Sequence, residues 1–293
     1  MKLKINELLN YEIIHHYDEN SGDEIKSTGN NFYIKVNGKE CAFSIPGQSK
    51  FLMRFRIFRR FLRYDKSNAV FNWNRDGIVV LFQWKIYFFD LNNKELIYIN
   101  NLKQCRNVLH GGIAVTSNAI CFGEYGHNPN REPVPIWTSN DDGRSFSIAK
   151  ELVEQKIKHI HGIYADKFNE SLWIVTGDFD GECYVIESDD SSFMKLSWYG
   201  DGSQKWRPVS LFFKPNEIIW VMDSPIQRAY LQIFNREKKT IKQGQYFPGP
   251  VWYSKQFKEG DAILQTTVEI GKEVKTRFSK VFYSENLVDW EEV

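Results

Sequence analysis

The sequence repeats one short pattern, a β-rich run that ends in a polar turn residue, at 86–90 (IYFFD), 136–139 (IWTS), 184–188 (YVIES), 231–235 (LQIFN) and 281–284 (VFYS). The last residues of these runs are 90, 139, 188, 235 and 284, so the intervals between them are 49, 49, 47 and 49 residues. A constant period of this length indicates a repeat architecture in which each unit is one supersecondary element. Because 293 residues divided by 49 is about six, the chain has room for six units.

Each unit contains four short β-rich segments separated by turn residues. In the unit from 108 to 150, strands are predicted at 109–115, 119–123, 134–139 and 146–149, with turns at 117–118 and 140–143. Four short antiparallel strands per repeat are typical of a β-propeller blade. The sequence therefore predicts an all-β fold, a single β-propeller domain over residues 1–293, with six blades of four-stranded antiparallel sheets.

The regular blades are predicted at about 69–105, 108–150, 159–200, 206–245 and 249–293, whereas residues 1–66 form a less regular N-terminal blade or extension. Within that part, 32–36 and 40–45 are predicted to pair around Asn37-Gly38, a dipeptide that favours two-residue hairpin turns. A closing strand from the C-terminal end of the chain would complete this sixth blade. A five-bladed ring with an N-terminal extension is the alternative.

The composition limits the class of protein. The 38 Lys and Arg residues balance 37 Asp and Glu residues, which argues against nucleic-acid binding, and aromatic residues make up 15% of the chain. Cys41, Cys105, Cys121 and Cys183 form no CxxC pair, so zinc-ribbon and thioredoxin chemistry are not indicated. Scattered cysteines favour a reducing compartment. No apolar run suits a signal peptide or a membrane span, so we expect a cytoplasmic protein without a transmembrane segment.

A distinctive turn follows the third predicted strand of the unit from 108 to 150, where residues 139–146 read SNDDGRSF. Asp141 can accept backbone N–H bonds within this turn, Gly143 can adopt a positive φ, and Phe146 can pack beneath the sheet. Residues 188–193 (SDDSSF) are a second copy without the glycine. Residues 284–290 are a third copy, with Asn286 at the aspartate position.

These turns resemble the Asp box, the S-x-D-x-G-x-T-W repeat of the sialidase superfamily of β-propellers, over about residues 69–293. The resemblance implies a propeller that acts on carbohydrate, either as a glycoside hydrolase or in the manner of the propeller-type polysaccharide lyases, which use His, Tyr and Arg on uronic acids. The sequence departs from true sialidases. It lacks their early Arg-Ile-Pro motif, and only Arg131 and Arg207 are well placed among the sialic-acid-binding arginines.

The candidate site follows from aligning the predicted blades. In a propeller the innermost strand lines a central channel, and its start lies at the same face as the end of the second strand. The strand starts carry His110, His161 and Arg207, and the second-strand ends carry Glu124, Tyr125, Asp178, Asp223 and Glu269. His159 joins them because positions i and i+2 of a strand share a face. These residues are therefore predicted to surround one channel mouth.

Three kinds of chemistry suit this set. Glu124 and Asp178 are candidates for the acid/base carboxylate pair of a glycoside hydrolase. Tyr125 or His161 could abstract a proton next to a uronate carboxylate, with Arg207 or a metal stabilising the resulting charge. A divalent metal could bind the histidines at positions 110, 159 and 161. The alternative is structural, because polar channel residues often only bind neighbouring blades and water.

The leading hypothesis is a carbohydrate-active enzyme that cleaves glycosidic bonds in an acidic oligo- or polysaccharide, with a hydrolase favoured over a lyase. In it Glu124, Tyr125, His161 and Asp178 are catalytic, and the substrate is bound by His110, Arg131, His159, Arg207, Asp223 and Glu269. A lyase that acts on uronic acids by β-elimination is one alternative. A non-catalytic propeller that binds a glycan or a protein is the other.

Two further segments have two readings each. The loop at 126–133 carries Arg131, which could pair with an anionic sugar or simply lie on the surface. The segment from Phe51 to Tyr64 (FLMRFRIFRRFLRY) contains five arginines and has apolar residues at near-helical spacing. It is predicted to be either a basic amphipathic helix that contacts an anionic surface, or an outer element packed on the first blades.

Overall fold

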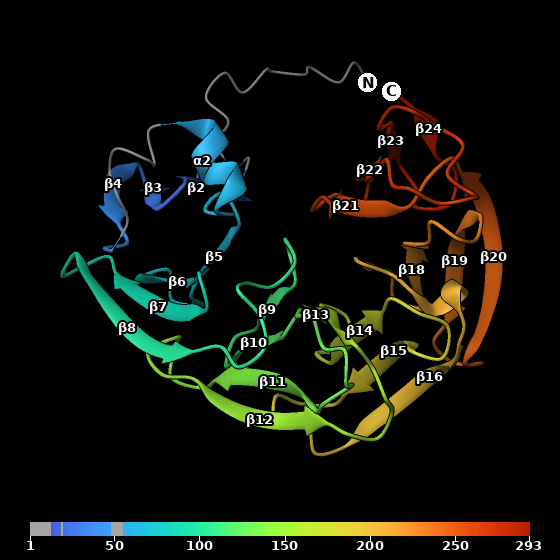
Figure 1. Cartoon of the computed structure of the whole chain (residues 1–293), viewed down its shortest axis with the longest axis horizontal. Coiled ribbons are helices and arrows are strands. Elements are labelled where there is room, and N and C mark those ends of the chain that lie inside the picture. The colour runs from blue at the N-terminus through green and yellow to red at the C-terminus, as the bar shows by residue number, and fades with distance from the viewer. Residues whose placement is uncertain (1–12, 19, 48–54) are drawn as a thin grey trace. The chain divides into compact units, whose positions relative to one another are not determined.

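The computed structural model describes residues 13–18, 20–47 and 55–293 and consists of six four-stranded antiparallel sheets that follow one another along the chain (Figure 1). The fold class is therefore an all-β, six-bladed β-propeller, as the period predicts. Internal contacts divide the chain into two compact units. Unit 1 comprises Met1–Gly126 and Trp137–Ile148, and unit 2 comprises His127–Ile136 and Ala149–Val293.

Each of the first three sheets uses its strands in chain order. The first contains β1 (Ile13–Tyr17), β2 (Glu24–Thr28), β3 (Asn31–Val36) and β4 (Lys39–Ser44). The second contains β5 (Ser67–Phe71), β6 (Gly77–Phe82), β7 (Lys85–Asp90) and β8 (Glu95–Asn101). The third contains β9 (Ile113–Val115), β10 (Ile120–Gly123), β11 (Val134–Ser139) and β12 (Ser147–Leu152).

The remaining three sheets lie in unit 2. The fourth contains β13 (His159–Ala165), β14 (Leu172–Gly177), β15 (Cys183–Ser188) and β16 (Leu196–Gly202). The fifth contains β17 (Phe212–Phe213), β18 (Glu217–Val221), β19 (Ala229–Asn235) and β20 (Thr240–Phe247). The sixth contains β21 (Val251–Gln256), β22 (Ala262–Thr266), β23 (Val281–Ser284) and β24 (Glu291–Glu292).

The repeated sequence pattern marks the same structural position each time. The five turn residues of the pattern are the last residues of the third strands β7, β11, β15, β19 and β23. The middle strands β6, β11 and β14 are buried along their whole length, whereas the outer strands β8, β16 and β20 are partly exposed. Among the third strands only β11 is buried throughout, and β19 and β23 alternate between buried and partly exposed residues, so the polar residue at the strand end is the constant feature of the pattern.

The N-terminal blade agrees with the sequence prediction in its hairpin and differs in its closure. Asn37 and Gly38 connect β3 to β4 with φ values of 50° and 73°, the left-handed conformations that a two-residue turn requires. The expectation of a closing strand from the C-terminal end is wrong. The fourth strand is β1, which pairs with β2, while β24 pairs with β23 in its own sheet. With six complete sheets, the five-bladed alternative is also wrong.

Two inner strands begin later than predicted. β9 starts at Ile113 and β17 at Phe212, so His110 and Arg207 lie in the connections that precede these strands. Residue Gly111 has a φ of 77°, and a short 3-10 helix occupies Gln204–Trp206. Both features bend the backbone away from the extended conformation before the strand can begin.

The turn that follows β11 has the local chemistry expected for it. Asp141 Oδ1 accepts a hydrogen bond from the Ser145 backbone N–H at 2.9 Å, and its other oxygen accepts one from the Ser145 hydroxyl. Gly143 has a φ of 88°, and Phe146 is buried in a core cluster of unit 1. These contacts stabilise the turn, and they describe a structural device rather than a site.

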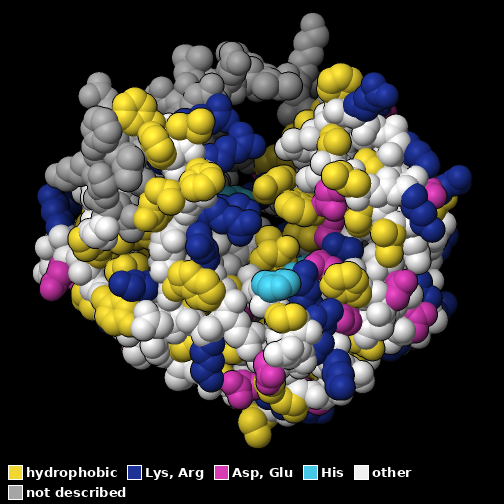
Figure 2. Space-filling model, in the orientation of Figure 1, with side chains coloured by type: hydrophobic (Ala, Val, Ile, Leu, Met, Phe, Trp, Pro, Cys, Tyr) yellow, Lys and Arg dark blue, Asp and Glu magenta, His cyan; other side chains and the backbone are white. Residues whose placement is uncertain are grey.

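Part of the basic segment from Phe51 to Tyr64 can be placed. Residues 51–54 lie outside the described residues, and α2 (Arg56–Phe61) follows them. Within α2, Arg59 is buried and its Nε lies 3.0 Å from Asp65 Oδ1, whereas Ile57 and Phe61 are exposed. Contact with an anionic surface remains a prediction. On the face seen in Figure 2, basic and acidic side chains are interspersed. In the described part of the chain, no helix is both long and apolar enough to cross a membrane.

Candidate functional site

Two strand ends in unit 2 place a histidine pair beside a carboxylate. The first residue of β13, His159, pairs with Gly177, the last residue of β14, so Asp178 follows directly at this end of the sheet. The register shifts between Ile160 and Gly162, and this bulge includes His161. The rings of His159 and His161 have centroids 5.1 Å apart, so both face the same end of the sheet.

Asp178 is the shared partner of four side chains. Its Oδ1 lies 3.2 Å from His161 Nε2, 3.4 Å from His159 Nε2 and 3.0 Å from the Arg207 guanidinium. Its Oδ2 accepts a hydrogen bond from Lys158 Nζ at 2.7 Å. Arg207 also donates to the Asp178 backbone carbonyl at 2.8 Å. The carboxylate is therefore held between two cations and two imidazoles.

A second layer of residues orients Arg207. Its guanidinium lies 3.2 Å from Asp223 Oδ2, and the other oxygen of Asp223 accepts a hydrogen bond from Trp252 Nε1 at 2.7 Å. Gln204 donates to the Asp178 carbonyl at 3.1 Å and accepts from Arg207 at 3.3 Å. Because Arg207 is 7% exposed and faces two carboxylates, its charge is both desolvated and neutralised.

Burial and neighbouring charged groups give the carboxyl groups of the site different pKa values. Burial would raise the pKa of Asp178, but its contacts with His159 and His161 outweigh this effect and hold the pKa far below its usual range. Burial raises the pKa of Asp223 and of Glu269, and Arg207 only partly opposes the rise in each. Asp178 is therefore ionised at neutral pH, and Glu269 is the partly exposed carboxyl group that most readily keeps a proton.

The two ring nitrogens of His161 face different acceptors. Its Nδ1 lies 2.8 Å from the Pro208 carbonyl oxygen, and its Nε2 lies 3.2 Å from Asp178 Oδ1. Both neighbours are acceptors, so a neutral ring, which carries one hydrogen, can satisfy only one of them. Burial lowers the pKa of His161 and so opposes a second proton on the ring, whereas Asp178 favours it. A second proton on the ring, or a metal cation between Nε2 and Asp178, would satisfy both acceptors.

The same residues meet the basic requirement for a metal site. Among the residues that the structure describes, His159, His161 and Asp178 form a group whose ligand atoms all lie within 4.8 Å of one another. A histidine that ligates a metal usually donates its other ring N–H to a backbone carbonyl or a carboxylate, and the Pro208 carbonyl lies where it can accept from His161 Nδ1. Two imidazoles and one carboxylate are a common ligand set for divalent transition metals.

An exposed aromatic ring adjoins this cluster. Phe179 is 52% exposed, and both Lys158 Nζ and the Arg131 guanidinium carbon lie 5.4 Å from its ring centroid. Arg131 Nε donates to Glu182 at 2.7 Å, and Glu182 also accepts the Lys158 backbone N–H at 3.1 Å. Arg131 therefore supports the loop beside Asp178, and Phe179 offers a flat surface against which a sugar ring could stack.

The other predicted site residues belong to unit 1 and have different surroundings. Glu124 is fully buried, and its carboxylate accepts hydrogen bonds from Trp137 Nε1 at 2.8 Å and from the backbone N–H groups of Lys103 and Gln104. This carboxylate stabilises the local fold. His110 lies near His15, with ring centroids 6.1 Å apart.

The predicted set is thus distributed over both units. His110, Glu124 and Tyr125 lie in unit 1, and Arg131, His159, His161, Asp178, Arg207, Asp223 and Glu269 lie in unit 2. The sequence prediction did not include Lys158 and Phe179. Their only signal was adjacency, since Lys158 precedes His159 and Phe179 follows Asp178.

Comparison with known proteins identifies the fold and no family. No family of known proteins matches the chain, and no curated protein matches it significantly. Similar solved structures include one from a study of two prolyl endopeptidases, with a TM-score of 0.60 and 10% identity over 96% of this chain and 43% of that one. Another is the dihydro-heme d1 dehydrogenase NirN in complex with DHE, with a TM-score of 0.55 and 10% identity over 99% of this chain and 54% of that one.

A third similar structure is an oligogalacturonate lyase in complex with manganese, with a TM-score of 0.49 and 10% identity over 97% of this chain and 85% of that one. The chain spans about half the length of NirN and less than half of the endopeptidase. NirN and the endopeptidase structure have different activities and are each only 10% identical to this chain, so the likeness to them shows a shared fold and no shared activity.

Proposed function

We propose that this chain is a metal-dependent enzyme that cleaves an acidic oligo- or polysaccharide by β-elimination at the cluster around Asp178. The observation that carries the proposal is the orientation of His161, whose two ring nitrogens both face oxygen acceptors, the Pro208 carbonyl and the Asp178 carboxylate. A divalent cation held by His159, His161 and Asp178 satisfies all three groups at once. Such a cation supplies Lewis-acid stabilisation of negative charge on the substrate.

The charged residues of the cluster suit an anionic sugar. Lys158, the more exposed of the two cations beside Asp178, can bind a substrate carboxylate, whereas the buried Arg207 holds Asp178 in place. Asp178, Asp223 and Glu269 balance these cations, which leaves a site able to take up a divalent ion. Phe179 adds a stacking surface at the edge of the cluster.

The distribution of carboxyl groups favours elimination over hydrolysis. Glycoside hydrolysis needs a carboxyl group that is protonated before it donates to the leaving oxygen. Asp178 has a strongly lowered pKa because of its contacts with the two histidines, and Glu124 is occupied by backbone and indole donors. Elimination instead removes the proton next to a uronate carboxylate and breaks the bond to the leaving sugar oxygen, so it needs positive charge near that carboxylate, which Lys158 and a bound cation would supply. Ionised Glu269, the partly exposed carboxylate near Asp178, would take the proton, and water would protonate the leaving oxygen.

Hydrolysis is the second candidate because of Glu269. Burial raises the pKa of this partly exposed residue while that of Asp178 is lowered, and two carboxyl groups with separated pKa values are the pattern of an acid and a base. In this version Glu269 donates the proton and Asp178 remains ionised. Binding of a glycan without turnover is the third candidate.

The experiment combines metal analysis with product analysis. The protein is dialysed against chelator, reloaded separately with manganese and zinc, and assayed on a panel of uronic-acid polysaccharides. Elimination produces an unsaturated product that absorbs in the ultraviolet, and hydrolysis produces new reducing ends without that absorbance. His161→Ala should lose bound metal and activity, while His127→Ala, which alters an exposed histidine, should keep both. Equal metal content and turnover in the two variants would refute the proposal.

A further inference from the structure

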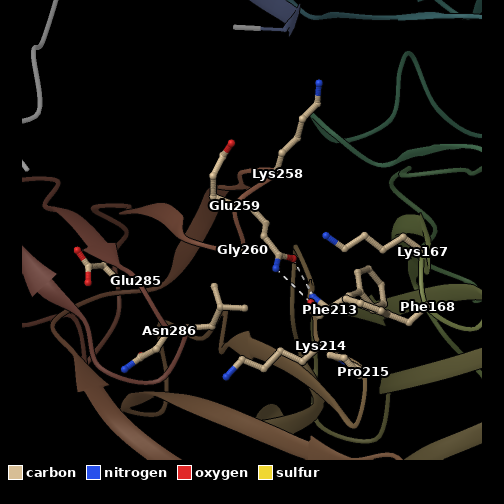
Figure 3. Close-up of a pocket in the computed structure, with 12 residues that line it drawn as sticks. Lys167, Phe168, Phe213, Lys214, Pro215, Lys258, Glu259, Gly260, Glu285 and Asn286 are labelled. Atoms are coloured by element: carbon tan, nitrogen blue, oxygen red, sulfur yellow. Dashed lines mark hydrogen bonds between the residues drawn. The ribbon is translucent and has the colours of Figure 1, made fainter. Parts of the chain in front are cut away.

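Unit 2 contains a second hollow, at the other ends of its strands. It is bounded by the turns that join β13 to β14, β17 to β18, β21 to β22 and β23 to β24, and its volume is about 380 Å³ (Figure 3). The Asp178 cluster lies at the start of β13, whereas this pocket lies beyond the end of β13. The pocket is therefore separate from the proposed metal site, and its size is within the usual range for small-molecule sites.

The backbone that carries the pocket is held by side-chain hydrogen bonds. Gln256 accepts from the Phe213 N–H at 3.0 Å and donates to the Phe213 carbonyl at 3.1 Å, which joins β21 to β17 (Figure 3). Arg236 Nε donates to the Lys214 carbonyl at 3.1 Å, and the same guanidinium pairs with buried Asp166. Two lining lysines, Lys167 and Lys214, therefore project from backbone positions that buried groups fix.

The lining is rich in lysine. Lys167, Lys214 and Lys258 face the pocket together with Glu259 and Glu285. Among the described residues, no carboxylate lies within 4.0 Å of the amino group of Lys167 or Lys214, and Lys167 Nζ lies 5.2 Å from the Phe168 ring centroid. Figure 3 shows the Lys167 side chain extending from its turn toward the other lining residues, while the Glu285 carboxylate points away from Lys167. Uncompensated cations in a concave surface attract a small anion.

The remaining lining residues suit a sugar. Phe168 is 41% exposed and shares its ring surface with Lys167 Nζ, so an aromatic ring and an ammonium group adjoin in the lining. Glu259 offers oxygen acceptors for hydroxyl groups, whereas the Asn286 side chain is held in its own turn, where its amide donates to Asp289 and its oxygen accepts from backbone N–H groups. Lysine side chains from separate turns, an aromatic ring and a carboxylate acceptor line one small volume, and these groups suit a sugar bearing an anionic substituent.

We propose that this pocket binds an anionic monosaccharide, either a sugar phosphate or a sugar acid, through Lys167 and Lys214. The proposal is independent of the catalysis proposed above, because it uses none of the residues around Asp178. The shared chemistry is a single oxyanion on a pyranose ring. Phosphate or carboxylate can supply that oxyanion, and the test separates them.

Isothermal titration with glucose 6-phosphate, glucuronic acid and glucose tests the proposal on the full chain. We expect at least one anionic sugar to bind and glucose not to bind, with affinity that falls as salt is raised. Lys167→Ala and Lys214→Ala should each weaken binding about tenfold, the effect of losing one charge-assisted hydrogen bond. The anionic sugar that binds more tightly identifies the oxyanion.

The controls make the result attributable to the pocket. Lys242→Ala removes an exposed lysine of β20 that does not line the pocket and should bind as wild type does. His161→Ala should also keep the binding while losing metal, so failure of the metal site and failure of this pocket are distinguishable. The proposal is overturned if no anionic sugar binds, if glucose binds equally well, or if the Lys167→Ala Lys214→Ala double variant binds unchanged.

Discussion

Two histidine pairs, one in each unit, differ in the partner that they face. In unit 1, His15 lies near His110 and its Nε2 is 2.8 Å from the Ser27 hydroxyl. In unit 2, His159 and His161 both face the carboxylate of Asp178. A hydroxyl group can rotate to donate or accept, so it satisfies a neutral imidazole in either tautomer, whereas a carboxylate can only accept.

This difference decides which pair can work as a site. The His15 pair needs no added charge, and burial together with the neighbouring His110 lowers the pKa of His15 to about 3. The His161 pair faces an ionised carboxylate and is satisfied only by a proton or a metal cation. Two buried histidines therefore do not indicate a site by themselves, and the nature of the third group is decisive.

The most severe test of the comparison is Asp178→Ala, which removes the shared acceptor in unit 2. The free energy of unfolding should fall by about 3–5 kcal/mol, because Lys158 and the buried Arg207 lose their partner, and bound metal should be lost. Chemical denaturation and metal analysis measure the two effects. Asp189→Ala is the matched control, since that carboxylate is exposed and lies 3.5 Å from Lys195. A loss below about 1 kcal/mol for Asp178→Ala would contradict the role assigned to this carboxylate.

Replacing one histidine from each pair compares the units directly. His159→Ala should weaken metal binding at least about 100-fold, since even residues that only support a ligand contribute 10–100-fold. His15→Ala should leave metal affinity unchanged, because its partners are hydroxyl groups. Competition against a chromophoric chelator gives both affinities. Similar losses in the two variants would show that the carboxylate does not distinguish the pairs.

The pH dependence of stability should reveal the unit 1 pair. The pKa of His15 is about 3 in the folded chain because of burial and His110, against 6.5 ordinarily, so between these values the unfolded chain binds the extra proton. Stability contributed by neutral His15 is therefore complete above about pH 6.5 and falls as the pH is lowered, by at most about 1.4 kcal/mol per pH unit.

Urea denaturation between pH 4 and pH 8 measures this slope. His15→Gln should make the slope shallower, because the substituted side chain does not titrate. His127→Gln, at an exposed position, should leave the slope as it is in wild type. If wild type and His15→Gln lost stability in parallel on acidification, the lowered pKa of His15 would be wrong.

The fold was largely predictable because a polar turn residue recurs at the same structural position in successive blades. The third strand of each blade from β7 to β23 ends in a polar residue, and the constant interval between these residues gives the blade count. The first blade was predicted only in its hairpin. Its third strand ends at Val36, 54 residues before Asp90, which is outside the period, and β1 (IIHHY) has no alternating pattern. Because the sequence of β1 does not identify it as a strand, the prediction wrongly places the closing strand at the C-terminal end of the chain.

The candidate site was predictable in position and not in environment. Aligning strand ends identified His159, His161 and Asp178, which the structure brings together. The same alignment treated Glu124 and Asp178 as equivalent. Their surroundings differ because Trp137 and two backbone N–H groups donate hydrogen bonds to Glu124. These donors are distant from Glu124 in the sequence, so no local pattern predicts them.

The smallest expected effect comes from Ser27→Ala, which removes the hydroxyl partner of His15. Ser27 Oγ lies 2.8 Å from His15 Nε2 and 3.2 Å from Ser67 Oγ, and Ser67 Oγ is itself 3.5 Å from the same nitrogen. Because Ser67 can take over as partner with a small shift, the loss in unfolding free energy should be about 1 kcal/mol or less. Chemical denaturation beside Asp178→Ala makes the comparison quantitative. A cost for Ser27→Ala equal to that of Asp178→Ala would mean that hydroxyl and carboxylate partners hold these histidine pairs equally strongly, and the distinction between the two pairs would fail.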